Sequence, residues 1–456
     1  MKPIAFCSLS LGLLAWLTVP AHAAESPKAP RYRLQVGQQL TYEGSSRFHY
    51  ENGAHGTTDK MTFWVASQNG DGSWRIIARN ENTFGQVHGK SDEPIPPGRA
   101  EEIFDAFDLY PDGRVANPPQ GFREKGLPDI FFPMPADFAS AQRGWQQEKE
   151  AGDKSLYLLA KQNDPESGKW VFERTDQGLF NEVYLSTSKA VIHFDGNRGL
   201  ITRVESEYTQ GYGFNGKGKG ILELKSAARK DPQWIAQLAS ETDILLKAKA
   251  ATRDALKAVQ QGNDGDKNVA ATEKMLRDGR EKVKLPIVVA QFNAQLEQFK
   301  SSASYQAEEK KRENDVLNKV AADWSTVDID GNKHSLAGYR GKVVVLDFWY
   351  RGCGWCIKAM PQIKEVVTHY EGKPVVVLGM NTDRIEKDAR FVMDKLKLNY
   401  ATLKAEGLPE KYGVQGFPTM IVIDQQGTVR GRHVGYSATL REDLIKQIDG
   451  LLTSRP

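Results

Sequence analysis

The spacing of hydrophobic positions along the chain changes near residue 230 and again near residue 320. From about residue 24 to residue 230, polar and hydrophobic residues alternate in short runs. In two of these runs the hydrophobic residues are spaced two apart or a multiple of two. They are Leu40, Tyr42, Phe48 and Tyr50 in the first run, and Met61, Phe63 and Val65 in the second. A period of two is typical of β-strands that bury one face.

Turn sequences rich in glycine separate these runs. Residues 24–230 hold 23 of the 41 glycines, and pairs such as Asp112-Gly113 and Asp195-Gly196 lie between alternating segments. We expect an antiparallel β-rich domain, either a sandwich or a strongly curved sheet. Residues 92–135, which are rich in proline and glycine, are expected to interrupt it as long loops.

Residues 231–320 have the spacing of helices. Asp231 and Pro232 form an N-cap with proline at the first helical position, and Gly262 is a suitable end. Hydrophobic residues of a later helix recur every three or four positions: Val289, Phe292, Leu296 and Phe299. We expect a helical spacer or hairpin packed on a neighbouring domain, and the alternative is a helix that self-associates to form a homodimer.

A continuous hydrophobic run marks the last stretch, residues 321–456. Val343 to Leu346 is typical of a strand buried on both faces, and it leads through a short turn into Cys353-Gly354-Trp355-Cys356 and a helical segment. A cysteine at a helix start meets unpaired N–H groups and the positive end of the helix dipole. We therefore expect the pKa of Cys353 to lie below the usual value of about 8.5. Cys356, one turn further, should be buried and able to attack a mixed disulfide formed by Cys353.

The cysteine count narrows the chemistry of this pair. The chain has three cysteines, and Cys7 lies in the N-terminal hydrophobic run, so a disulfide-stapled scaffold is excluded. A zinc site needs four ligands, and the sequence has no second CxxC pair or nearby histidine pair. A structural bridge over so short a loop would constrain little of the unfolded chain. Dithiol–disulfide exchange is the favoured interpretation.

Further positions agree with one family. Asp347 and Trp349 precede the cysteine pair, Pro361 follows it, and Gly416-Phe417-Pro418-Thr419 and Gly435 come later. With these motifs, residues 321–456 resemble the thioredoxin superfamily, and most closely its secreted TlpA/ResA-type group. The resemblance covers 136 of the 456 residues. It implies an α/β thioredoxin-like C-terminal domain, with the extra N-terminal hairpin of that group within residues 324–342.

The resemblance also implies roles for individual residues. Cys353 attacks a substrate disulfide and Cys356 resolves the mixed disulfide. Asp347 is the acid behind Cys356; burial should raise its pKa and let it accept the proton of that thiol. Four residues are expected to contact the substrate, and the proline among them is cis in this family: Trp355, Phe417, Pro418 and Thr419.

Substrates and partners follow from the same resemblance. It implies protein thiols and disulfides as substrates and a membrane-bound or exported redox partner as the source of electrons, with no metal or organic cofactor. Reduction is the preferred direction, and isomerisation is the alternative if the helical segment forms a dimer. The Gly354-Trp355 pair is unusual, and the lysine that often partners the buried acid is replaced near Gly379 and Met380. The redox potential is therefore left open.

The N-terminus predicts export. Lys2, the hydrophobic run from Ile4 to Val19 and Ala21-His22-Ala23 match a secretory signal peptide, residues 1–23. An uncleaved N-terminal membrane anchor is the alternative, although the run is shorter than the roughly 20 residues that span a bilayer. The expected location is the periplasm or cell envelope. A net charge of +3 is no reason to expect a nucleic-acid partner.

Two weaker signals lie in the β-rich stretch. Residues 211–218 fit G-x-x-x-x-G-K but end in Gly218, where a hydroxyl should hold magnesium, so we expect a hairpin loop. His49, His55 and His88 lack the paired spacing of metal ligands. A second hypothesis is that the protein is a binding protein and not primarily an enzyme. In it, residues 24–230 bind a ligand, lipid or envelope polymer, and the thioredoxin-like domain is a redox sensor. Nothing in these residues identifies such a ligand.

Overall fold

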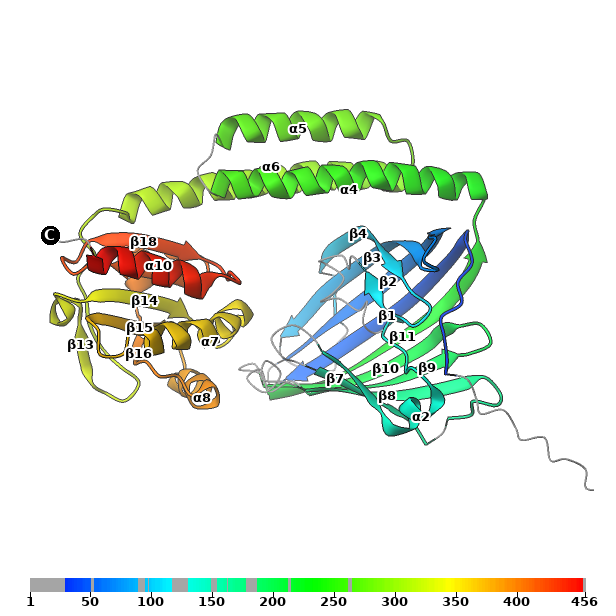
Figure 1. Ribbon diagram of the computed structural model, residues 1–456, viewed down its shortest axis with the longest axis horizontal. Helices are drawn as coiled ribbons and strands as arrows, with labels where there is room; N and C mark the ends of the chain where they lie inside the picture. The colour runs from blue at the N-terminus through cyan, green and yellow to red at the C-terminus, as the bar shows by residue number, and fades with distance from the viewer. Residues whose placement is uncertain are drawn as a thin grey trace, which may run out of the picture.

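The computed structural model describes residues 29–453, apart from 51–52, 89–94, 97, 117–129, 149–153, 162, 178–186, 212–214 and 261–264. The predicted signal peptide and Gly262 therefore lie outside the described residues. Figure 1 shows a large curved sheet, a layer of long helices beside it, and an α/β part reached through the last of these helices. Within the described ranges, no helix is long and apolar enough to cross a membrane.

The first part of the chain forms one antiparallel sheet of eleven strands. In order across the sheet, the strands are β5 (Val115–Ala116), β4 (Arg99–Leu109), β3 (Trp74–His88), β2 (Gly53–Gln68), β1 (Gln38–Tyr50), β11 (Asn215–Arg229), β10 (Leu200–Gly211), β9 (Thr187–Asp195), β8 (Lys169–Gln177), β7 (Lys154–Leu159) and β6 (Trp145–Glu148). Strands β1 to β5 pair in sequence order, as do strands β6 to β11, and β1 pairs with β11 to join the two halves. The strongly curved sheet is thus the observed form, and a sandwich is not.

The prediction of long loops over residues 92–135 was wrong in part. Strand β4 lies inside this stretch and pairs with β3 from Trp74 opposite Leu109 to Phe84 opposite Arg99. Proline and glycine are confined to the flanks of β4, and residues 99–109 contain neither. A composition averaged over the whole stretch therefore hid an ordinary strand. Residues 211–218 join β10 to β11, whose ends pair at Gly211 and Asn215, as a hairpin requires.

The alternating pattern divides the sheet into two faces with separate cores. Leu40, Tyr42, Met61 and Phe63 point to the inner face and contact a hydrophobic plug from residues 130–134 and Tyr32. Tyr32 donates a hydrogen bond to the Ile130 carbonyl at 2.9 Å, which fixes the plug to the N-terminal segment. This plug closes one end of the curved sheet.

Three helices cover the outer face: α4 (Pro232–Gln260), α5 (Gly265–Glu281) and α6 (Pro286–Val316). Helices α4 and α6 lie next to the sheet, and α5 packs on these two helices on the side away from the sheet. The predicted N-cap is confirmed, because Asp231 Oδ1 accepts the backbone N–H of Gln233 at 2.9 Å and of Trp234 at 3.0 Å. The predicted stripe is also confirmed: Phe292 and Phe299 are buried and share a core with Trp64 of the sheet. The helices thus cover a sheet of this same chain.

The last part of the chain is an α/β unit. Its elements are β12 (Ser325–Val327), β13 (Lys333–Ser335), the 3-10 turn η2 (Leu336–Tyr339), β14 (Val343–Trp349), α7 (Gly354–His369), β15 (Val375–Asn381), α8 (Glu386–Leu396), β16 (Thr402–Lys404), α9 (Leu408–Lys411), β17 (Thr419–Ile423), β18 (Val429–Val434) and α10 (Leu440–Thr453). Five strands form a sheet in the order β16-β15-β14-β17-β18, and β12 pairs with β13 as the expected hairpin. Every residue of β14 is buried, because β14 is the central strand and both faces are covered.

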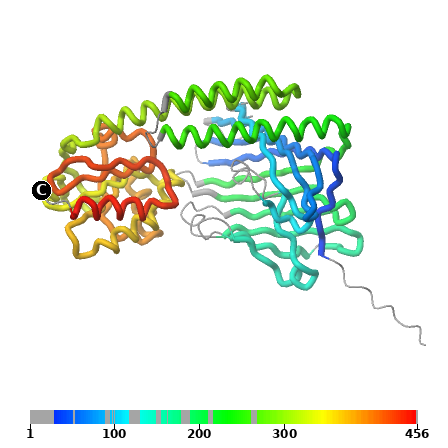
Figure 2. The backbone as a smooth tube through the Cα atoms, turned by 45° about the horizontal axis from the view of Figure 1, so that its top comes forward, coloured from blue at the N-terminus to red at the C-terminus, as the bar shows by residue number. Residues whose placement is uncertain are grey.

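Helix α6 links the sheet to the α/β unit. Near its start, the Gln291 amide donates to Glu102 of β4 at 2.6 Å. Near its end, Glu309 lies 2.8 Å from Arg432 of β18, and only 2% of the Arg432 side chain is exposed. The two side chains are close enough to form an ion pair, but their geometry is not that of a hydrogen bond. Arg432 donates its hydrogen bond to the Gly413 carbonyl instead, at 2.9 Å. One continuous helix therefore contacts both parts, and Figure 2 shows it spanning them.

Candidate active site

The candidate site lies where the central strand β14 ends and α7 begins. Cys353 is the N-cap of α7, and its sulfur accepts the backbone N–H of Cys356 at 3.1 Å. A disulfide joins Cys353 to Cys356. Since backbone N–H groups and the helix dipole favour negative charge at this position, the first cysteine is placed where a thiolate is stabilised. The strand–turn–helix geometry expected for the CxxC motif is confirmed.

The two cysteines differ in how deeply they are buried. Cys353 is 5% exposed and Cys356 is 1% exposed. Both belong to a small core with Trp349, Ile357 and Met360. Cys353 is therefore the less buried of the two cysteines, as expected for the one that a substrate disulfide meets first. Pro361, which the resemblance to the thioredoxin superfamily places after the cysteine pair, lies inside this helix.

Asp347 lies on β14, two residues before Trp349, in the interior of the sheet. Its side chain is almost completely buried, and burial raises its pKa to about 7. The hydroxyl of Tyr400 donates to Asp347 Oδ2 at 3.3 Å, which lowers the pKa and so opposes that effect in part. The raised pKa predicted for this residue is confirmed. A carboxyl that titrates near neutral pH can exchange a proton during turnover.

The surroundings of Asp347 explain why its pKa stays high. In the register of the sheet, Asp347 lies opposite Gly379 of β15, which in turn lies opposite Thr402 of β16. Gly379 adds no side chain beside the carboxyl: a Cβ atom there would lie 2.9 Å from Trp349 Nε1 and 3.0 Å from Thr402 Oγ1. In the resemblance, a lysine often partners the buried acid. Here the residue opposite Asp347 in the sheet is Gly379.

The loop before β17 carries the predicted substrate contacts. The peptide bond between Phe417 and Pro418 is cis, as expected. Phe417 packs beside the cysteine core, and its ring meets that of Tyr350 edge-on at 5.2 Å. Thr419 differs from the prediction, because its side chain is fully buried and its hydroxyl donates to the Gly416 carbonyl at 2.8 Å. Thr419 therefore holds the loop.

Exposed aromatic rings surround the cysteine pair. Trp355 is 48% exposed and stacks on Tyr436 with ring centres 5.5 Å apart. The Lys358 ammonium lies 4.6 Å above the Trp355 ring. Tyr350 is exposed as well. Trp355 was predicted from the motif, whereas Tyr350, Tyr436 and Tyr400 were not. Tyr436 follows Gly435 directly and could have been found from that neighbour, but Tyr400 carries no local signal.

No metal centre accompanies this site in the part of the chain that the structure describes. There, no group of three or more histidine, cysteine or acidic side chains could hold a metal ion. His55 stacks on Phe48 with ring centres 4.9 Å apart, and desolvation lowers its pKa. That histidine is part of an aromatic cluster of the curved sheet.

We expect Tyr400→Phe to raise the pKa of Asp347 by up to about one unit, because the charged carboxylate loses its hydroxyl donor. The measurement is the carbon NMR shift of the Asp347 carboxyl against pH. Tyr412→Phe is the matched control, since Tyr412 is also buried but donates to the Ala322 carbonyl. An unchanged titration midpoint in Tyr400→Phe would show that the 3.3 Å contact does not stabilise the carboxylate.

A sheet with CxxC at the start of a helix, beside a loop with a cis proline, is the arrangement of a thioredoxin-like fold. A model of the AhpC/TSA family matches residues 317–432. The chain is 31% identical to the thioredoxin-like protein YneN of Bacillus subtilis over 134 residues, which are 29% of this chain and 79% of that protein. It is 29% identical to the thiol-disulfide oxidoreductase ResA of Geobacillus thermodenitrificans, over 29% of this chain and 75% of that protein.

Among solved structures, a putative thiol:disulfide interchange protein DsbE from Chlorobium tepidum is similar over the same region, with 30% sequence identity. The match covers 30% of this chain and 97% of that chain, and its TM-score is 0.29. The assignment rests on the sequence relatives. Through its C-terminal unit, the chain belongs to the family of thioredoxin-like thiol-disulfide oxidoreductases that includes YneN and ResA. These relatives match under a third of the chain, so they say nothing of the curved sheet.

Proposed function

We propose that this enzyme reduces protein disulfides through Cys353 and Cys356. The observation that carries the proposal is the position of Cys353, at the N-terminus of α7 and bonded to a more deeply buried partner cysteine. A first cysteine at the helix N-terminus and a more deeply buried second cysteine are what a two-step exchange needs. The names of the relatives agree with this chemistry and leave its direction open.

Atoms and electrons balance when the reaction is written with these residues and one redox partner. The Cys353 thiolate attacks one sulfur of the substrate disulfide, forms a mixed disulfide and releases the other substrate sulfur as a thiolate. The Cys356 thiol passes its proton to the Asp347 carboxylate and attacks the sulfur of Cys353. That attack releases the second substrate thiolate and leaves the Cys353–Cys356 disulfide. A reduced membrane-bound or exported partner then supplies two electrons to restore both thiols.

The charges near the cysteines support reduction as the direction of exchange. A strong oxidant needs a reduced form that is stabilised, most often by a cation beside the thiolate. Here the intervening pair, Gly354-Trp355, is uncharged, and the buried acid Asp347 disfavours negative charge nearby. Both features favour a low potential and hence reduction. The N-terminal sequence supports action on the exported side of the membrane, where disulfides form.

The test is the reduction potential of the Cys353/Cys356 couple, measured by mass spectrometry of alkylated thiols across glutathione buffers of graded poise. We expect a value nearer the roughly −270 mV of thioredoxin than the roughly −120 mV of a strong oxidant. A value near the latter would reverse the proposed direction. Light scattering on the same sample measures the mass in solution, because a dimer with an intermediate potential would favour isomerisation instead.

A further inference from the structure

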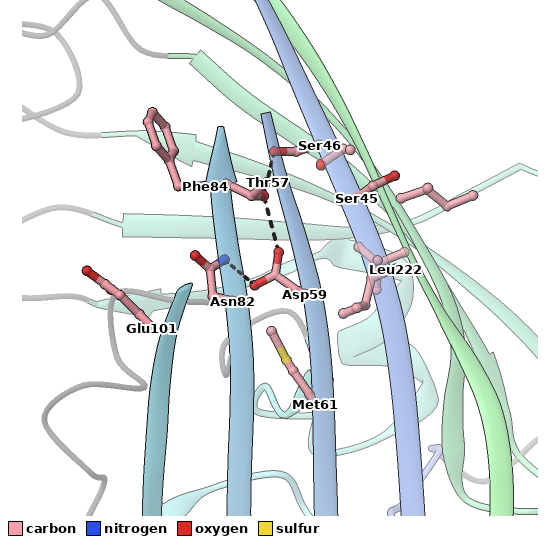
Figure 3. A pocket seen from close by; sticks show the side chains of 14 residues that line it. Ser45, Ser46, Thr57, Asp59, Met61, Asn82, Phe84, Glu101 and Leu222 are labelled. Atoms are coloured by element: carbon pink, nitrogen blue, oxygen red, sulfur yellow. Dashed lines mark hydrogen bonds between the residues drawn. The ribbon is translucent and has the colours of Figure 1, made fainter. Parts of the chain in front are cut away.

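The inner face of the curved sheet has a polar end that the hydrophobic plug does not fill. Across the strands, Thr57, Ser46, Gly220 and Ser206 follow one another in register on this face. These small side chains line a hollow of about 620 Å³, which Figure 3 shows from close by. We call this row of four residues, together with Asp59 and Asn82, the trough.

The trough is bounded on both sides. Toward the end of β1, the next row in register is an aromatic ridge, in which Phe48 stacks on His55 and, with ring centres 5.8 Å apart, on Tyr208. On the opposite side lie Met61 and Leu222, which belong to the core beneath the plug. The trough is therefore a band of small residues between two walls of large hydrophobic side chains.

The floor of the trough is a chain of hydrogen bonds that ends on a carboxylate. Ser46 and Thr57 lie 2.9 Å apart between hydroxyl oxygens, and Thr57 donates to Asp59 at 3.2 Å. Asn82 donates to the other oxygen of Asp59 at 2.7 Å, as Figure 3 shows. Hydroxyls and a carboxylate each accept more than one hydrogen bond, so these groups can also bind the N–H groups of an extended polypeptide.

The charge of the hollow selects among ligands. Its lining contains two carboxylates, of Asp59 and Glu101, and no lysine, arginine or histidine among the described residues. Phosphate-bearing and other anionic ligands would meet repulsion without any paired cation. A neutral or basic polypeptide segment matches both the charge and the hydrogen-bonding groups.

The position of the trough connects it to the redox site. Figures 1 and 2 show that the edge of the α/β unit where β14 ends and α7 begins is turned toward the end of the curved sheet where β1 meets β2. Helix α6 holds this arrangement through its contacts with Glu102 on the sheet and Arg432 on the α/β unit. The aromatic ridge lies between the trough and that end of the sheet, so a polypeptide bound in the trough would cross the ridge before it reached the cysteines.

We propose that the trough binds an extended, neutral or basic segment of the disulfide-bearing substrate protein and so delivers its disulfide to Cys353. This inference rests on the proposed reductase function. It makes the curved sheet the specificity module of the enzyme, and it gives the hydrogen-bonding groups of the trough a role.

The test compares a small disulfide, bis(2-hydroxyethyl) disulfide, with disulfide-linked peptide dimers flanked by Lys-Ser or by Glu-Ser repeats. Dithiothreitol regenerates the full-length enzyme, and kcat/KM is measured for each probe. Thr57→Trp fills the trough, whereas Thr58→Trp is the matched control, because Thr58 is exposed on the other face of the same strand. Asp59→Asn removes one charge and keeps the shape.

We expect wild type to prefer the Lys-Ser peptide to the Glu-Ser peptide by about threefold or more, and Asp59→Asn to lose that preference. In Thr57→Trp, the ratio of kcat/KM for the Lys-Ser peptide to that for the small disulfide should fall at least about fivefold. In Thr58→Trp this ratio should stay at the wild-type value. Equal ratios in the two tryptophan variants, or an undiminished preference in Asp59→Asn, would overturn the inference. Failure of wild type to turn over the small disulfide would instead refute the reductase function.

Discussion

Cys353→Ser is expected to lower disulfide reduction by at least about 10³-fold, because no other described sulfur is positioned to attack a substrate. Serine is a good N-cap, so its hydroxyl can still accept the Cys356 N–H and α7 should begin at the same residue. The measurement is the turnover of bis(2-hydroxyethyl) disulfide with dithiothreitol as the reductant. Activity within tenfold of wild type would refute the role of Cys353.

Cys356→Ser is the matched partner of this experiment. It keeps the attacking thiolate and removes the resolving thiol, so one substrate half should stay attached to Cys353. Mass spectrometry of the unreduced protein detects this adduct as an added mass. If Cys353→Ser accumulates the adduct and Cys356→Ser does not, the order of the two cysteines is the reverse of the one proposed.

Asp347→Asn should change both stability and rate. Because burial places the pKa of Asp347 at about 7 in the folded chain, against 3.8 for an ordinary carboxyl, the folded state holds a proton that the unfolded state has lost. The unfolded state thus binds fewer protons between about pH 4 and pH 7, and the free energy of unfolding falls as pH rises through this window. The full loss is about 4 kcal/mol, reached above pH 7. Asparagine cannot ionise, so the variant should lack this slope.

The stability change is measured by hydrogen exchange of the β14 amides at several pH values between 4 and 9, in wild type and variant. Acids with lowered pKa, such as Asp328 at about 2, lose their contribution below this window. Asp383, whose pKa is raised, and His55, whose pKa is lowered, contribute equally in wild type and variant, so the difference between the two slopes reports Asp347 alone. The attack of Cys356 on the mixed disulfide should also slow by roughly 10² or more, because the proton acceptor is gone. Asp394→Asn, on the exposed surface of α8, is the control for both readouts. Identical slopes in wild type and Asp347→Asn would show that Asp347 is already charged at low pH.

Local sequence predicted the redox site well, because its parts are fixed by short-range rules. The cis form of Pro418 was implied by the resemblance to the thioredoxin superfamily, whereas local patterns predicted two elements: an apolar β-branched run specifies the central strand, and a cysteine N-cap starts α7. Each of these depends on residues within a few positions of one another. The same is true of Asp231, whose carboxylate caps α4 as its neighbours predict.

The residues that sequence analysis missed are those brought in from a distance. Tyr400 reaches Asp347 across 53 positions, and the trough combines strands from the beginning and the end of the β-rich stretch of sequence. A period of two shows that a strand buries one face, but it does not show which residues lie opposite one another. The pairing of β1 with β11 places Ser46 beside Gly220. These strands are far apart in the sequence, and no local pattern shows that they pair.

The 31-residue helix α6 sets the distance between the two parts that it contacts and also the angle by which one part is rotated relative to the other about the helix axis. Each residue of an α-helix adds about 1.5 Å of length and about 100° of rotation. Removing or inserting one residue between Gln291 and Glu309 would swing the cysteines roughly a quarter turn around the helix axis. Surface substitutions along α6 should therefore be tolerated far better than any change in its length.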